Sequence, residues 1–157
     1  SGLFYIVVCF PAVLGKKDTQ LTPNIVPKIL SGEFFRCGKE DQKISLMVVD
    51  NLGPIVNKII ESGPLNDEMN CCCTEVWWSE FVQEYFDLLG VPYEAPKKSI
   101  LSLLGNLSDQ GFMLISSFSA WGSHFCSDKL KQRLGPIEKV KTWKIALKEA
   151  LEAYNQN

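Results

Sequence analysis

The stretch CCCTEVWWSEF, from Cys71 to Phe81, brings thiols, indole rings and carboxylates together within a short length of chain. Thiolates are good ligands for zinc, which takes four ligands in a tetrahedron in its structural sites. Neighbouring side chains of an extended strand point to opposite faces, so at most two of the three consecutive cysteines could share one ion. Further ligands would have to come from a distant part of the chain, where the single histidine, His124, lies two residues before Cys126.

A metal hypothesis therefore names four ligands: Cys71, Cys73, His124 and Cys126. Zinc sites usually contain paired cysteines with CxxC-like spacing, and the chain has no CxxC motif. The same absence argues against thioredoxin-like redox chemistry. We favour the alternative that residues 71–73 form a short buried strand of small apolar side chains, and we expect neither a bound metal nor a cofactor.

Acid–base chemistry has two candidates, Asp50 and His124. Asp50 ends an apolar stretch that predicts a strand, and ligands of open α/β sheets bind beyond the carboxyl ends of the strands. Aspartate at a strand end also commonly caps the next helix, and we favour that role for Asp50. Serines surround His124, but the GxSxG motif of a serine hydrolase is absent. An enzyme, or a degenerate enzyme, with a site around these two residues at the C-terminal edge of the sheet is the second hypothesis.

Phosphate and nucleic-acid binding receive little support from motifs or composition. The chain contains neither GxxxxGK[ST] nor GxGxxG, the glycine-rich loops that cradle phosphates. Its formal net charge is -2, and only Arg36 and Arg133 supply the guanidinium fork best suited to phosphates and base edges. A nucleic-acid-binding domain is therefore the third hypothesis. No apolar run approaches the roughly 20 residues of a membrane span, so we expect no membrane partner.

The cysteines also indicate a compartment. Disulfide frameworks space their cysteines through loops, whereas three of the six here are consecutive and Cys9 lies in a predicted strand. Free thiols predict a reducing environment, cytoplasmic or nuclear. A length of 157 residues suits one domain. Because the sequence begins Ser-Gly without an initiator methionine, we expect this domain, residues 1–157, to be cut from a larger protein.

The most informative predicted element is a helix over residues 74–89. Glu80, Glu84 and Asp87 form a narrow acidic stripe on it, and apolar side chains fill the rest, an arc much wider than the roughly 100° that one core contact requires. Either the helix is sandwiched inside the domain, or part of its aromatic face meets a partner, since interfaces favour aromatic residues in their centres. The residues predicted to bind a partner are Trp77, Trp78, Phe81, Val82, Tyr85 and Phe86.

The leading hypothesis is thus a non-catalytic interaction domain, an adaptor or scaffold for complex assembly in a larger intracellular protein. Its partner would be another protein or a second copy of the chain.

Strands alternate with helices along the predicted chain. This order predicts an α/β fold: a three-layer sandwich with a mainly parallel sheet of about four to five strands and helices on both faces. The first strand, LFYIVVCF, is continuously apolar and β-branched, so we expect it to be buried on both faces. The predicted strands cover residues 3–10, 44–50 and 112–118, and the predicted helices residues 22–30, 52–62, 74–89, 99–107, 127–134 and 136–154.

Overall fold

The computed structural model of the protein describes residues 5–38, 40–63, 66–99, 109–136 and 138–156. The strands in these ranges are β1 (Tyr5–Cys9), β2 (Ala12–Leu14), β3 (Lys43–Val48), β4 (Asn66–Asn70) and β5 (Thr74–Trp77). The helices are α1 (Leu21–Leu30), a short 3-10 helix η1 (Val49–Asn51), α2 (Leu52–Glu61), α3 (Trp78–Leu89), α4 (Gln110–Trp121), α5 (Asp128–Leu134) and α6 (Trp143–Tyr154).

The strands pair in two groups. β1 pairs in parallel with β4, with Tyr5 opposite Asn66. β3 is the centre of a three-stranded sheet in which β2 pairs with it in parallel and β5 antiparallel. β3 reads KISLMV and is buried at every position after Lys43, as is typical of a central strand covered on both faces.

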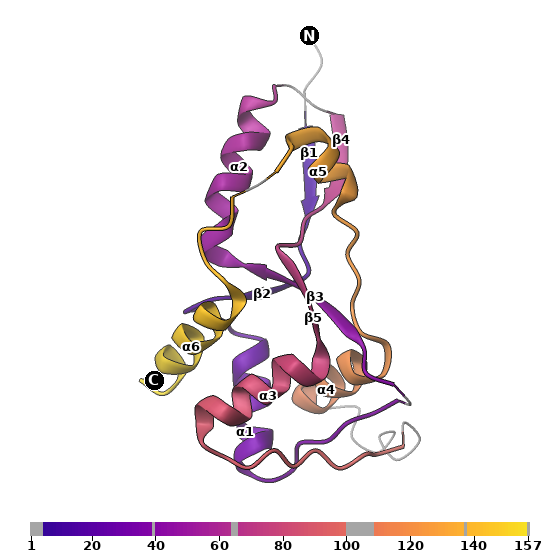
Figure 1. Ribbon diagram of the computed structural model, residues 1–157, viewed down its shortest axis with the longest axis vertical. Coiled ribbons are helices and arrows are strands. Elements are labelled where there is room, and N and C mark those ends of the chain that lie inside the picture. Colours follow the sequence, from indigo (N-terminus) through magenta and orange to yellow (C-terminus); the bar gives the residue numbers. More distant parts are fainter. Residues whose placement is uncertain (1–4, 39, 64–65, 100–108, 137, 157) are drawn as a thin grey trace.

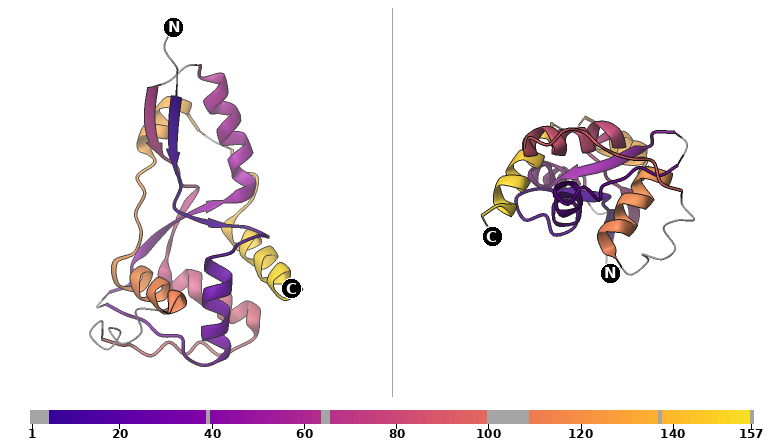
Figure 2. Two further views of the ribbon diagram at one scale, coloured as in Figure 1. Left: turned by 180° about the vertical axis from the view of Figure 1, so that it is seen from behind. Right: turned by 90° about the horizontal axis from the view of Figure 1, so that it is seen from below.

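The molecule is elongated, and its elements divide between two ends (Figure 1). One end holds β1, β4, α2 and α5, and the other holds α1, α3, α4 and α6, with β2, β3 and β5 crossing between them. Seen from below, α3 lies on one side of the strands while α1 and α4 lie on the other (Figure 2). The predicted α/β class with parallel strand pairing and helices packed around the strands is confirmed.

Each end has its own hydrophobic core. The larger core combines α1, α3, α4 and α6 with β3, and aromatic rings dominate it, among them Phe34, Phe81 and Phe112. The smaller core lies where α2 and α5 meet β1 and β4, and it is built around Met47, Ile59 and Leu130. β3 joins the two, because Leu46 belongs to the larger core and Met47, on the opposite face, to the smaller.

Several element predictions are wrong. Residues 112–118 belong to the helix α4 and not to a strand. Residues 74–77 form the strand β5, so the aromatic helix begins at Trp78, and the last helix begins at Trp143 instead of near residue 136. Residues 71–73 form no strand and connect β4 to β5. The helix predicted over residues 99–107 falls almost entirely outside the described residues.

The first strand is confirmed in type but not in burial. Tyr5 and Val7 on β1 are 57% and 45% exposed, while the intervening Ile6 and Val8 pack on the smaller core. Alternating side chains of a strand point to opposite faces, so one face of β1 is covered and the other is open.

Candidate functional site

Helix α3 is part of the core and offers almost none of its aromatic surface to a partner. Of the residues predicted to bind one, Trp78, Phe81, Val82, Tyr85 and Phe86 are each at most 2% exposed. Rings from four other segments surround them: Phe34, Tyr93, Phe118 and Trp143. The wide apolar arc therefore reflects a helix enclosed on several sides. Trp77, which lies on β5, is 47% exposed, and its ring lies 5.0 Å from Lys43 Nζ.

The sequence candidates that do come together line a cavity beside β5, which we call the polar hollow. It has a volume of about 380 Å³, within the range of about 300–1,000 Å³ typical of small-molecule sites. Its lining includes Cys73, Glu75, His124, Cys126 and three lysines, Lys43, Lys131 and Lys139. Asp50 and Cys71 are not part of it.

The backbone of residues 123–125 places His124 in the polar hollow. The Ser45 amide donates to the carbonyl oxygen of Ser123 (2.7 Å), and the Phe125 amide donates to Ser45 Oγ (2.9 Å). Gly122 permits this close approach to β3: its φ is 67°, and a Cβ added there would lie 2.3 Å from the Lys43 carbonyl oxygen. The segment therefore runs along β3 as an added extended piece.

His124 forms an ion pair with Glu75 when its ring is protonated. Its Nδ1 lies 2.5 Å from Glu75 Oε1, and the imidazole is 68% exposed. Nδ1 is thus the ring nitrogen that faces a carboxylate, and Nε2 is the one that does not. The pair thus resembles the base and orienting acid of general acid–base sites.

Lysine side chains outnumber carboxylates around the polar hollow, with Lys43, Lys131 and Lys139 against Glu75 and Asp128. Glu75 is engaged by His124, and Lys131 Nζ lies 3.8 Å from Asp128. Among the described residues, no carboxylate lies within ion-pair distance of Lys139. The hollow therefore presents net positive charge to an incoming ligand.

Lys139 and Cys73 also border two neighbouring cavities. One, the apolar hollow, has a volume of about 210 Å³ and is lined by side chains such as Ile55 and Leu130. The other, of about 320 Å³, lies at the carboxyl end of β3 next to Trp143. Lys139 and Cys73 thus lie where three cavities of different chemistry meet.

Asn51, which no sequence motif indicates, holds the segment that carries Lys139. It is only 1% exposed. Its Oδ1 accepts hydrogen bonds from the amides of Val140 (2.8 Å) and Lys141 (2.9 Å), and its Nδ2 donates to the Lys141 carbonyl oxygen (2.9 Å). One buried side chain at the end of β3 therefore satisfies three backbone groups of a segment about 90 residues away.

Asp50 neither caps α2 nor lines the polar hollow. Its carboxylate accepts a hydrogen bond from Lys141 Nζ at 2.9 Å, and the same ammonium group donates to Glu149 at 2.7 Å. The hydrogen bond to Glu149 is the largest cause that raises the pKa of Lys141 above its ordinary value, and the hydrogen bond to Asp50 is the second. The capping interpretation of Asp50 is wrong, because its carboxylate pairs with a lysine and α2 has no side-chain cap.

The four predicted metal ligands do not converge on one point, although Cys73, His124 and Cys126 all line the polar hollow. Cys71 is fully buried, and burial raises the pKa of its thiol to about 12. Cys73 Sγ lies 3.0 Å from Met47 Sδ, and Cys126 is exposed. No cluster of three or more metal-ligating side chains occurs in the part of the chain that the structure describes.

Two other loop acids have structural roles at helix starts. Asp18 accepts hydrogen bonds from the amides of Gln20, Leu21 and Thr22 at the start of α1, and Asp41 accepts from the Ser79 amide at the start of α3. Both satisfy amides that a helix N-terminus leaves without a partner. Cavities adjoin both loops, but their carboxylates are already engaged.

Comparison with solved structures identifies the fold. A nucleoside-diphosphate-sugar epimerase from Pseudomonas aeruginosa is similar with a TM-score of 0.71 and 15% identity, over 99% of this chain and 49% of that one. UDP-glucose 4-epimerase from Thermotoga maritima, solved with UDP-glucose, gives 0.66 and 16% over 98% and 47%. dTDP-glucose 4,6-dehydratase from Bacillus anthracis, solved with NAD, gives 0.64 and 17% over 97% and 45%. This chain has a fold found in sugar-nucleotide epimerases and dehydratases, and it spans about half their length.

Neither protein-family models nor curated protein sequences give a match.

The hypothesis of a non-catalytic adaptor or scaffold domain is wrong. The similar structures are those of enzymes, and the aromatic helix on which the hypothesis rested is buried in the chain's own core. None of the helices in the described residues has the length and apolar character that crossing a membrane requires.

Proposed function

We propose that this chain is part of a larger enzyme acting on a nucleotide-linked sugar, and that the polar hollow holds the phosphates of this substrate. The observation that carries the proposal is the hollow itself, where three lysines and the His124–Glu75 pair face a cavity of about 380 Å³. Its occurrence in a fold shared with sugar-nucleotide epimerases and dehydratases supports the substrate class.

The charges of the polar hollow match a diphosphate. Ammonium groups bind phosphate as point charges without a fixed geometry, and Lys139 is the cation best placed for this role, because it has no carboxylate partner among the described residues and borders all three cavities. Asn51 fixes the backbone next to it. The apolar hollow then offers space for a less polar part of the ligand.

His124 supplies the proton-transfer chemistry in this proposal. With Glu75 at its Nδ1, the Nε2 atom is the one free to exchange a proton with a hydroxyl of the bound sugar. The exposure of the ring suits a group that must reach a ligand entering from solvent.

A dinucleotide cofactor, such as the NAD of the similar dehydratase, does not fit the residues of this chain. Its pyrophosphate is normally cradled by a glycine-rich turn that leads from the first strand straight into a helix N-terminus. Here β1 leads to Pro11 and a second strand, and the loop from β2 to α1 contains one glycine, Gly15, instead of a glycine-rich turn.

A cytoplasmic or nuclear setting belongs to the same proposal. Cys37 and Cys71 are buried free thiols, and Cys72 and Cys73 are partly buried beside the hollows. Such thiols persist in a reducing compartment.

Calorimetric titration with UDP-glucose, UDP and uridine tests the binding site. We expect UDP-glucose and UDP to bind, with an affinity that falls as salt is added, and uridine to bind far more weakly because it has no phosphate. Lys139→Glu should weaken UDP binding by roughly tenfold or more, the effect of losing a charge-assisted contact.

Lys148→Glu is the matched control, since Lys148 is an exposed lysine on α6 that lines none of these cavities. UDP binding that is absent, or that is weakened equally by Lys148→Glu, would contradict the proposal.

A further inference from the structure

β1 combines the composition of a central strand with the surroundings of an edge strand. Exposed edge strands normally carry charged residues or proline, which prevent unwanted pairing with other strands. The sequence of β1, YIVVC, contains neither. Purely parallel sheets occur almost only where both faces are covered. Yet β1 is one strand of a parallel pair, and its outer face, defined by Tyr5 and Val7, is about half exposed.

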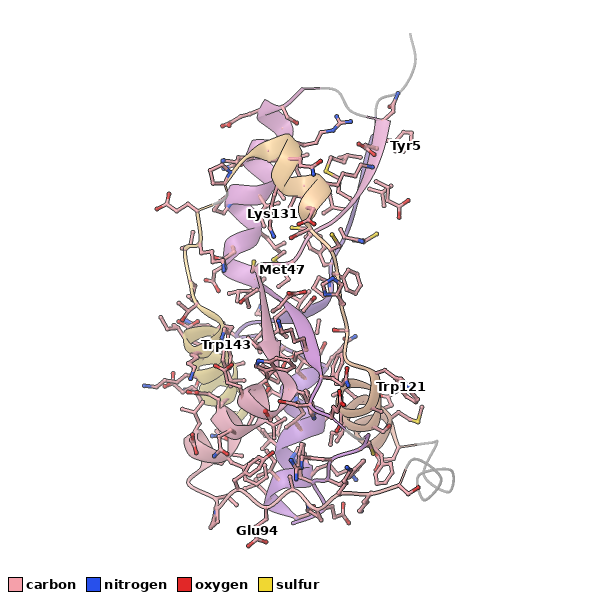
Figure 3. The ribbon with its side chains drawn as sticks, turned by 45° about the vertical axis from the view of Figure 1, so that its right-hand side comes forward. Tyr5, Met47, Glu94, Trp121, Lys131 and Trp143 are labelled. Atoms are coloured by element: carbon pink, nitrogen blue, oxygen red, sulfur yellow. The ribbon has the colours of Figure 1, made fainter. Side chains whose placement is uncertain are left out.

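The open surface includes a backbone edge as well as a side-chain face. Within the described residues β1 pairs with β4 alone, so its second edge has amide and carbonyl groups without a strand partner. Figure 2 (left) shows β1 in the foreground with no helix across it, and Figure 3 shows Tyr5 directed away from α2. Apolar side chains and unpaired backbone groups together form a surface suited to another strand.

We propose that the free edge of β1 receives an additional parallel strand, and its outer face a helix, both supplied by an α/β segment outside these 157 residues. The three structures compared above match 97% or more of this chain but only 45–49% of their own length, so about as much structure again accompanies this fold in them. The existing β1–β4 pair is parallel, and a sheet of this kind continues with parallel strands and helices on both faces. This surface lies apart from the polar hollow, so the inference does not depend on the proposed substrate.

A second copy of this chain is a poorer occupant. Homodimers are most often related by a two-fold axis, and such an axis through the edge of β1 places the two β1 strands antiparallel. That arrangement gives a parallel–antiparallel mixture and leaves the outer face without the covering helix.

Photo-crosslinking in the natural polypeptide that carries residues 1–157 tests the proposal. A benzophenone amino acid replaces Tyr5 or, separately, Val7, and mass spectrometry identifies the linked residues; a neighbouring strand lies roughly 5 Å away. We expect both positions to link to residues from outside residues 1–157, on an apolar strand beside β1 and on the helix that covers its outer face. For a parallel strand, the residue linked from position 7 lies C-terminal to the residue linked from position 5.

Three comparisons make the result decisive. The same crosslinker at Ile145, an exposed position on α6, should give several-fold less product. Val7→Lys should abolish linking from position 5 while the isolated chain keeps its melting temperature, and Lys139→Glu should leave linking unchanged. Links only to a second copy of β1, links in antiparallel order, or yields equal to those at position 145 would each overturn the proposal.

Discussion

At the scale of single residues, the polar groups at the end of β3 show how burial assigns roles that sequence order does not. Asp50 and Asn51 are neighbours, but Asp50 is exposed and pairs with Lys141, whereas Asn51 is buried and satisfies three backbone groups of residues 140–141. A carboxylate in the position of Asn51 could accept the two amide hydrogen bonds but could not donate to the carbonyl. The amide side chain is thus the one whose donors and acceptors match the site.

Asn51→Ala should lower the free energy of unfolding by about 1–3 kcal/mol, because it leaves buried backbone groups without partners. It should also weaken UDP binding, since the segment carrying Lys139 loses its anchor. Urea unfolding and calorimetric titration measure the two effects. The exposed Asn57 of α2 is the control, and Asn57→Ala should change neither. A variant that unfolds like the wild type would show that the segment is held by other contacts.

At the scale of elements, the sequence predicted class and order better than boundaries. Helices α1 and α2 and strand β3 follow directly from apolar periodicity. Residues 112–118 were misassigned because their apolar run fits a buried strand and a buried helix equally well. The signal that could have decided was Asp109, whose carboxylate accepts from the Phe112 amide as the N-cap of α4. For α3, the width of the apolar arc could not distinguish a core helix from an interface helix. Whether its aromatic face is covered depends on rings that distant segments of the chain contribute.

The candidate site could be predicted only in part. His124, Cys73 and Cys126 do lie at one cavity, but Glu75 and Lys139 depend on how residues 123–125 and 138–141 return to β3 and β5. Such long-range returns leave no periodic pattern in the sequence. Gly122 marks the point where residues 123–125 approach β3, but its positive φ and its closeness to the Lys43 carbonyl oxygen are visible only in the structure.

Adjacent tryptophans give a direct test of the burial of α3. Trp78→Ala removes a side chain that is 2% exposed and should cost about 3–5 kcal/mol of unfolding free energy. Trp77→Ala removes a half-exposed ring that lies against the ammonium group of Lys43, and should cost about 1 kcal/mol or less. Chemical denaturation of both variants measures the difference. Equal and small losses of unfolding free energy would mean that the aromatic face of α3 is exposed and not part of the core.

At the scale of the whole molecule, ion pairs tie elements together at both ends. Asp67 on β4 pairs with Lys129 and Arg133 of α5, and Asp109 at the start of α4 pairs with Lys28 of α1 at 2.7 Å. The hydrogen bond from Lys129 lowers the pKa of Asp67, and the hydrogen bond from Lys28 lowers the pKa of Asp109. Each pair joins residues more than 60 positions apart, so each supports tertiary packing.

These pairs predict the response to acid. A carboxyl group whose folded pKa is depressed stabilises the protein above its ordinary pKa of 3.8, and this contribution is lost as the pH falls through the folded value. Melting temperatures of Asp67→Asn and Asp109→Asn should therefore lie below the wild type near neutral pH, and the gap should close below about pH 4. Glu94→Gln, at an exposed position (Figure 3), is the control. A gap that stays constant into acid would rule out this electrostatic origin.

The pairing of β1 with β4 also affects how the chain folds during its synthesis. Tyr5 meets Asn66, 61 positions later, so during synthesis β1 must leave the ribosome and wait until the whole of α1, β3 and α2 has followed. Contacts of such sequence separation form late, because loop closure must precede any gain from them. Throughout that interval the apolar strand β1 has no partner strand and is accessible to chaperones. The end of the molecule that contains β1 should therefore complete its packing only after β4 has emerged.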